Sequence, residues 1–131
     1  MKKILVAVLG LVVVLGIFAV VYRGDRVGFD KEHGKPVVKI GAILPLTGNL
    51  AYVGNFVKGA MEIAVYDANM RPNNKYHYEM VFEDNAFSAV KTIPVLNKLI
   101  FIDKVDALTT VGNSIGEIVG PIVEKNKVPH I

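Results

Sequence analysis

Ser114 is the residue whose sequence neighbours best match those of a catalytic nucleophile. The run Gly112-Asn113-Ser114-Ile115-Gly116 fits the Gly-x-Ser-x-Gly pattern, in which a sharp strand-to-helix turn exposes the serine hydroxyl. A serine hydrolase also needs a histidine and an acid, and past residue 114 the chain offers only Glu117, Glu124 and His130. We therefore expect no catalytic residue. We favour a helix start at Ser114 that presents its hydroxyl and free N–H groups, with a serine hydrolase as the alternative.

Two pairs of titratable residues could hold a metal or move a proton. His77 and Glu79 are two apart in an extended segment, so both side chains would lie on one face, but no third ligand is apparent. Glu83 and Asp84 end the same segment, where paired carboxylates could do acid–base work or simply form a solvated turn. We expect no metal site and no cofactor.

Several other function classes lack support in the sequence. Gly54 and Gly59 are not followed by the Lys-Ser/Thr of a phosphate loop. The letters LPLTG at 44–48 match a sortase signal, but an amphipathic helix follows where that signal needs an apolar span and a basic tail. The absence of cysteine excludes disulfides, thiolate metal sites and a lipid-modified cysteine. The net charge of +3 includes Lys2 and Lys3, so we expect no nucleic-acid partner.

The N-terminal segment predicts export. Lys2 and Lys3 precede an uncharged apolar run at residues 4–21, about 27 Å long as a helix and enough to cross the hydrocarbon core. Its end offers no small-x-small cleavage site, so we favour an uncleaved membrane anchor over a signal peptide in residues 1–22. Residues 23–36 are polar and glycine-containing, so we expect a linker with no packed element. The protein would lie at the cell membrane, facing the periplasm or the cell exterior.

Residues 37–131 alternate between strand and helix patterns. Apolar or alternating segments predict strands at 37–44, 76–83 and 105–111, and the start of a fourth strand at 128–131. Apolar residues at helical spacing predict helices over about 57–68, 92–100 and 115–126. Such alternation implies an α/β fold with a parallel sheet and helices on both faces.

The start of the second helix depends on Pro94. A helix capped by Ser88 would carry the proline in its interior, where the missing N–H and the ring disrupt the hydrogen-bond ladder. A start at Thr92 puts the proline in the first turn instead. We therefore expect the helix to begin at Thr92.

The predicted fold also indicates where a ligand would bind. In open α/β sheets, ligands sit beyond the carboxyl ends of the strands, where the strand order reverses, commonly between the first and third strands. That rule selects the loop at 45–53 and the loop at 112–114.

A series of short motifs runs in order from Val38 to Ile131. They are IGAILPLTG at 40–48, Gly54, AMEIA at 60–64 leading to Asn69, FEDN at 82–85, KLI at 98–100, DKVDA at 103–107 and PIVEKNKVP at 121–129. In this order and spacing the motifs resemble the periplasmic leucine/isoleucine/valine-type (branched-chain amino acid) solute-binding protein family. The resemblance implies a partial N-terminal lobe of a type I periplasmic binding protein over residues 37–131.

The resemblance also implies a function. This family binds small solutes, typically amino acids or amides, between two α/β lobes and presents them to a membrane transporter without any covalent step. First-lobe contacts would come from Tyr52 and from Asn113 or Ser114. The expected partners are an amino acid-like small molecule, the permease of an ABC transporter, and the membrane through the N-terminal helix. The protein is then not an enzyme.

Two departures from the family pattern shape these expectations. Relatives are considerably longer, so we expect this chain to be a fragment. They usually carry a cleavable signal or a lipid-modified cysteine, whereas an uncleaved helix is expected here. A ligand-sensing ectodomain of a membrane receptor is therefore the alternative to transport, because the same fold can serve both roles.

Overall fold

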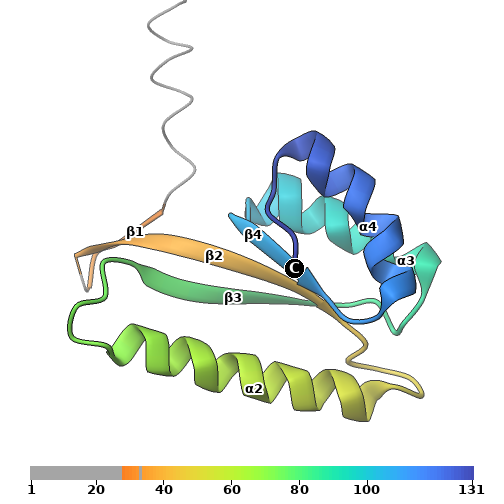
Figure 1. Ribbon diagram of the computed structural model, residues 1–131, viewed down its shortest axis with the longest axis horizontal. Coiled ribbons are helices and arrows are strands. Elements are labelled where there is room, and N and C mark those ends of the chain that lie inside the picture. The colour runs from red at the N-terminus through yellow and green to blue at the C-terminus, as the bar shows by residue number, and fades with distance from the viewer. Residues whose placement is uncertain (1–27, 33) are drawn as a thin grey trace, which may run out of the picture.

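The computed structural model describes residues 28–32 and 34–131 (Figure 1). The segment expected as a membrane anchor, residues 1–22, lies outside these ranges. Among the helices of the described ranges, none combines the length and the apolar character needed to cross a bilayer.

A four-stranded sheet forms the centre of the fold. Its middle strand is β2 (Lys35–Leu44), which pairs in parallel with β3 (His77–Asp84) on one edge and with β4 (Ala107–Thr110) on the other. The short strand β1 (Gly28–Asp30) pairs antiparallel with the first residues of β2. The predicted parallel sheet is therefore confirmed, but β1 makes the whole sheet mixed. A strand thus occupies part of the stretch expected to hold no packed element.

The last residues of the chain extend the sheet beside β4. Leu108 and His130 form a parallel bridge, and the N–H of Leu108 donates to the carbonyl of Pro129 at 2.8 Å. The N–H of Ile131 donates back to the Leu108 carbonyl at 3.0 Å. The predicted start of a fourth parallel strand is confirmed. The order across the sheet is β3, β2, β4 and then residues 129–131, so the strand order reverses at β2 and β4.

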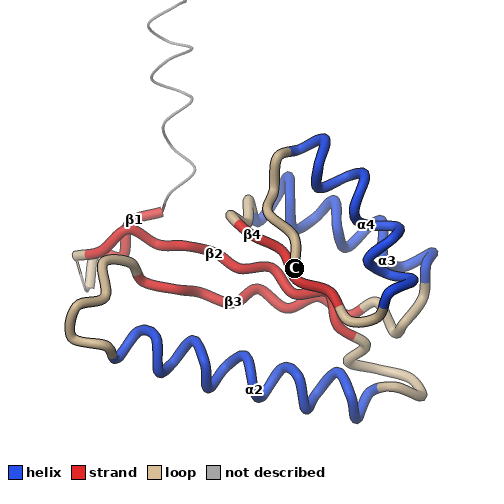
Figure 2. The backbone as a smooth tube through the Cα atoms, viewed as in Figure 1, coloured by secondary structure: helices blue, strands red, loops and turns tan. Residues whose placement is uncertain are grey.

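Helices cover both faces of the sheet (Figures 1 and 2). The long helix α2 (Ala51–Met70) runs along one face, whereas α3 (Ala89–Asn97) and α4 (Asn113–Asn126) lie together on the other. A π-helical segment, Lys98–Asp103, continues from α3. The buried core lies between the sheet and the α3–α4 layer. It consists of Ile43, Leu96, Leu99, Val105, Leu108, Ile115, Val119, Val123 and Val128.

A glycine allows α2 to pack closely against the end of β2. A Cβ atom placed on Gly54 would lie 2.1 Å from the carbonyl oxygen of Pro45, far inside van der Waals contact. Gly54 is also the one buried residue of α2. The helix therefore contacts the strand end through backbone rather than through a side chain.

The helix α3 begins one turn before Thr92. Ser88 is its N-cap, and the Ser88 hydroxyl accepts from the N–H of Lys91 at 3.5 Å. The Thr92 hydroxyl donates to the Ser88 carbonyl at 2.8 Å and receives the amide of Asn85 at 3.0 Å. The predicted start at Thr92 was wrong, because the buried Thr92 hydroxyl forms both of these hydrogen bonds from a position already inside the helix. Pro94 lies within the helix at the cost of one backbone hydrogen bond.

Candidate ligand site

Three loops meet at the carboxyl ends of the parallel strands. They are residues 45–50 after β2, residues 85–88 after β3, and residues 111–112 after β4. The first and third loops are those that the position of the strand-order reversal selects. The side chains of two residues from β3 and its loop, Asp84 and Phe87, join the three loops into one surface.

Asp84 fixes the loop after β2. One carboxylate oxygen accepts from the backbone N–H groups of Leu46 and Ala86, each at 2.8 Å, and from that of Thr47 at 3.2 Å. The other oxygen accepts from the Thr47 hydroxyl. Burial alone would raise the pKa of Asp84, but the hydrogen bonds from the Thr47 hydroxyl and the three N–H groups together lower it below its ordinary value.

The loop after β3 holds two residues in left-handed backbone conformation. Ala86 has a φ of 48° and Phe87 a φ of 56°, a region that side chains with a Cβ disfavour. The fully buried Asn85 holds them there, because its side-chain oxygen accepts from the N–H of Phe87 at 3.0 Å and its own N–H donates to the Leu44 carbonyl at 3.2 Å. Strained backbone conformations that several hydrogen bonds hold in place are typical of functional loops.

Phe87 connects the loops after β3 and β4. A Cβ atom placed on Gly112 would lie 2.6 Å from a ring carbon of Phe87, so the ring packs directly on the glycine backbone. Gly112 also has a φ of 97°, which favours glycine for a second reason. The Phe87 side chain remains 39% exposed, so part of its ring lies on the surface that a ligand would contact.

The expected ligand contacts lie on the helices that follow these loops. Tyr52 is in the first turn of α2 and its side chain is 75% exposed. Asn113 and Ser114 are the first residues of α4, and both are exposed. No hydrogen bond within the described ranges joins Tyr52 to Asn113 or Ser114. The structure thus brings Asn113 and Ser114 together and places Tyr52 across the strand-order reversal, and their role in binding stays a prediction.

The start of α4 presents unpaired backbone donors. Gly112 caps the helix without a side chain, and its carbonyl accepts from the N–H groups of Ile115 at 3.1 Å and Gly116 at 3.0 Å. The N–H groups at the first positions of a helix have no acceptor within the helix. They and the helix dipole together favour an anionic group at this point.

The surroundings of Ser114 differ from those of a hydrolase nucleophile. A nucleophile elbow holds its serine on a strained turn, whereas Ser114 lies in the first turn of α4 and has no positive φ. The Nε2 atom of His130 lies 3.0 Å from the Thr110 hydroxyl. In the part of the chain that the structure describes, no histidine is hydrogen-bonded to Ser114.

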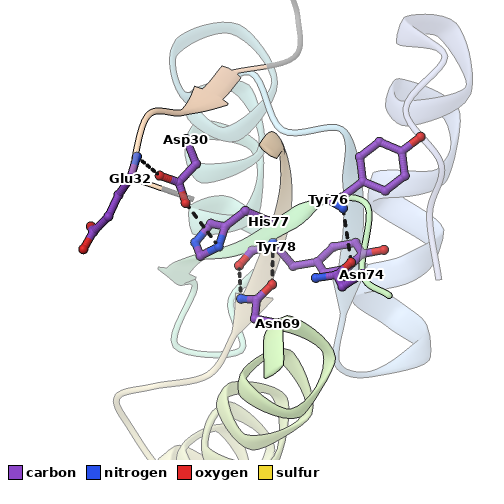
Figure 3. Close-up of polar contacts among 7 residues, drawn as sticks. All are labelled: Asp30, Glu32, Asn69, Asn74, Tyr76, His77 and Tyr78. Atoms are coloured by element: carbon purple, nitrogen blue, oxygen red, sulfur yellow. Dashed lines mark hydrogen bonds and ion pairs between the residues drawn. The ribbon is translucent and has the colours of Figure 1, made fainter. Parts of the chain in front are cut away.

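The other candidate residues have separate partners. His77 lies 3.5 Å from the Asp30 carboxylate (Figure 3). The Lys98 ammonium donates to the carboxylates of Glu83 at 2.6 Å and Asp103 at 2.9 Å, and its hydrogen bond to Glu83 raises the pKa of the lysine. Glu83 and Asp84 thus bind different partners and do not form a pair of carboxylates for acid–base chemistry. Over residues 28–32 and 34–131, no group of three or more acidic, histidine or cysteine side chains could hold a metal ion.

The family model described as "Periplasmic binding protein" matches residues 37–131. The chain belongs to the periplasmic binding protein family. The resemblance that the motifs predicted is thereby confirmed. The family consists of binding proteins rather than enzymes. Among curated protein sequences, none matches the chain.

Solved structures of this family share the fold of the chain. A leucine binding protein, LivK, from Thermotoga maritima is 29% identical with a TM-score of 0.63, covering 71% of this chain and 26% of its own. A solute binding protein of an ABC transporter from Rhodopseudomonas palustris, solved with 3,4-dihydroxybenzoic acid, is 25% identical with a TM-score of 0.64, covering 72% and 26%. LivJ from Streptococcus pneumoniae, solved with isoleucine, is 23% identical with a TM-score of 0.64, covering 72% and 28%. The chain spans about a quarter of the length of these proteins.

Two residues of the site were missed by sequence reasoning. Asp84 was noted only as one of two carboxylates at a strand end, and Phe87 was not singled out. The partners of Asp84 in the β2 loop lie 37 and 38 residues away, so no local pattern shows them. A usable signal was the segment Asp84-Asn85 at the end of a strand, because both side chains readily accept hydrogen bonds from the backbone of a turn.

Proposed function

We propose that the chain forms part of the first lobe of an extracytoplasmic protein that binds a small solute and delivers it to an ABC transporter. The observation that carries the proposal is the single surface that three loops form at the strand-order reversal of a periplasmic binding protein lobe. Solute binding proteins of ABC transporters are among the similar structures, which supports the transport role. The solute would be an amino acid or an amide.

The first turn of α4 supplies the anion-binding part of the proposed site. A carboxylate would accept from the N–H groups of Asn113 and Ser114 and from the Ser114 hydroxyl. Asn113 adds an amide donor from an exposed side chain. These groups need no rearrangement to bind, because the glycine cap and the Phe87 ring already fix the turn.

Tyr52 supplies the apolar part of the proposed site. Its exposed ring, in the first turn of α2, offers a flat surface for the aliphatic or aromatic portion of a solute. Asp84 and Thr47 act by positioning the loop that precedes this turn. The solute leaves unchanged, since the proposed contacts are hydrogen bonds and packing.

We further propose that residues 1–22 tether the lobe to the membrane and that residues 23–27 separate it from the surface. This arrangement would hold the lobe on the periplasmic or outer side of the cell membrane, close to a permease. The apolar run at 4–21 is long enough to span the hydrocarbon core, which supports this part of the proposal.

A ligand titration tests the binding function. Saturation-transfer NMR on the detergent-solubilised chain would compare leucine, isoleucine and valine with isoamylamine, which keeps the leucine side chain but lacks the carboxylate. We expect transfer to at least one of the amino acids and little to isoamylamine. The Ser114→Ala variant should weaken binding several-fold, whereas Lys125→Gln, at an exposed position in the last turn of α4, should not. Equal transfer to isoamylamine and the amino acids would contradict the carboxylate site.

A further inference from the structure

A recess lies at the opposite end of α2 from the candidate ligand site. It occupies about 440 Å³ between the C-terminal end of α2 and the start of β3. That volume lies within the range of small-molecule sites. The 20 residues of α2 span about 30 Å, so this recess, termed here the tyrosine pocket, is remote from Tyr52.

Two tyrosine rings form one wall of the tyrosine pocket. Tyr76 and Tyr78 have ring centroids 6.4 Å apart and ring planes tilted by 53°. Both rings extend to the same side of β3 and its preceding loop (Figure 3). Tyr76 is 43% exposed, so its ring is accessible from solvent. Such a pair offers apolar faces against which a flat ring can pack.

Asparagine side chains hold the backbone of this wall in place. The amide group of Asn69 donates to the Tyr78 carbonyl at 2.9 Å and accepts from the Tyr78 N–H at 2.8 Å (Figure 3). The side-chain oxygen of Asn74 accepts from the Tyr76 N–H at 3.2 Å. The N–H of Asn74 donates in turn to the Arg71 carbonyl at 3.1 Å. The pocket is therefore formed before any ligand arrives, which lowers the ordering cost of binding.

The charged side chains that line the tyrosine pocket favour an anionic ligand. Arg71 and Lys75 line it, and no carboxylate is among the lining residues. The side-chain nitrogen of Asn74 is buried and has no hydrogen-bond partner within the described ranges. Two cations with no carboxylate among the lining residues favour an anion in the pocket.

We propose that the tyrosine pocket binds a small aromatic carboxylate. The ring packs against Tyr76 and Tyr78, and the carboxylate is held by the guanidinium of Arg71 and the ammonium of Lys75. This site is independent of the solute site proposed above, because it lies at the amino-terminal edge of the sheet and shares no residue with it.

Amide chemical shifts test this proposal in the whole chain. Benzoate is titrated into the ¹⁵N-labelled, detergent-solubilised protein, with benzamide as the uncharged control of the same shape. We expect saturable shifts of the amides of residues 71–78 with benzoate and at least roughly tenfold weaker binding of benzamide. The double variant Arg71→Gln/Lys75→Gln should weaken benzoate binding by a similar factor, and the exposed-lysine control Lys125→Gln should leave it unchanged.

Three results would overturn the proposal. They are an absence of saturable shifts at residues 71–78, shifts that the double variant does not weaken, and shifts confined to Tyr52, Asn113 and Ser114. The last result would place the aromatic acid in the other site and would leave the proposed solute-binding function intact. If the double variant does not fold, Lys75→Gln alone replaces it, because Lys75 lies in an exposed turn. Benzoate binding that this single variant does not weaken would also overturn the proposal.

Discussion

At the scale of single residues, the candidate site depends on one acidic side chain. Asp84 accepts hydrogen bonds from two loops at once, through the N–H groups of Leu46, Thr47 and Ala86 and the Thr47 hydroxyl. Through these bonds the carboxylate links the loop that leads into α2 to the end of β3. Asp84 is therefore a positioning residue for the site rather than a ligand contact.

Removing the Asp84 carboxylate should destabilise the fold. Asp84→Ala removes the acceptor of the Thr47 and Ala86 N–H groups and of the Thr47 hydroxyl, whereas the Leu46 N–H keeps the Leu44 carbonyl at 3.0 Å. We expect a loss of about 1–3 kcal/mol in the free energy of unfolding. Chemical denaturation measures it. Glu79→Ala, at an exposed position of the same strand, is the matched control and should change stability by about 0.5 kcal/mol or less. Equal losses in both variants would contradict the assigned role.

The contribution of Asp84 should also depend on pH. Because hydrogen bonds from the Thr47 hydroxyl and three N–H groups hold the folded-state pKa of Asp84 below its ordinary value, the carboxylate adds stability above the unfolded-state pKa. That stability is lost as the pH falls through the lower folded-state pKa. The stability difference between the native chain and Asp84→Asn should therefore be constant near neutral pH and shrink below about pH 4. Denaturation series from pH 6 to pH 2.5 check this, and a difference that grows on acidification would contradict it.

At the scale of elements, the contact between α2 and β2 depends on the absence of a side chain at Gly54. Two glycines in the same helix separate this packing effect from helix propensity, because a Cβ at Gly54 meets the Pro45 carbonyl at 2.1 Å and one at Gly59 meets no atom within 4 Å. Alanine is the better helix former at both positions. Only the packing differs between them.

Alanine at these two glycines should act in opposite directions. Gly54→Ala should destabilise the chain by about 1–3 kcal/mol, because the helix must move away from the strand end. Gly59→Ala should stabilise it by up to about 1 kcal/mol. Thermal or chemical unfolding of the two variants measures both effects. Stabilisation by Gly54→Ala would contradict the close contact between the helix and the Pro45 carbonyl.

Local patterns predicted most of these elements but not their details. The alternation of apolar strands and amphipathic helices gave the correct order of β2, α2, β3, α3, β4 and α4. The predicted start of α3 was wrong because the buried hydrogen bond between Asn85 and Thr92, which no local pattern shows, fixes Thr92 inside the helix. The strand β1 was missed because its three residues pair through the backbone and carry no apolar pattern of their own.

At the scale of the whole molecule, the sequence predicted where the candidate site lies in the fold but not the contacts that join its loops. A parallel sheet with helices on both faces places ligand loops at the strand-order reversal, and Tyr52, Asn113 and Ser114 do lie beside it. The links made by Asp84 and Phe87 could not be predicted, because they join segments far apart in the chain and depend on backbone conformation. The family match over residues 37–131 agrees with the fold that the pattern predicted.

The most direct test of the account is an amide chemical-shift map of the ¹⁵N-labelled chain with leucine. The account predicts saturable shifts at Gly112, Asn113 and Ser114 and in the first turn of α2 around Tyr52, with the amides of residues 71–78 unchanged. Asn126→Ala, at the far end of α4, should give the same map as the native chain. If leucine, isoleucine and valine all leave the amides of residues 112–114 unshifted, the proposed solute site is contradicted.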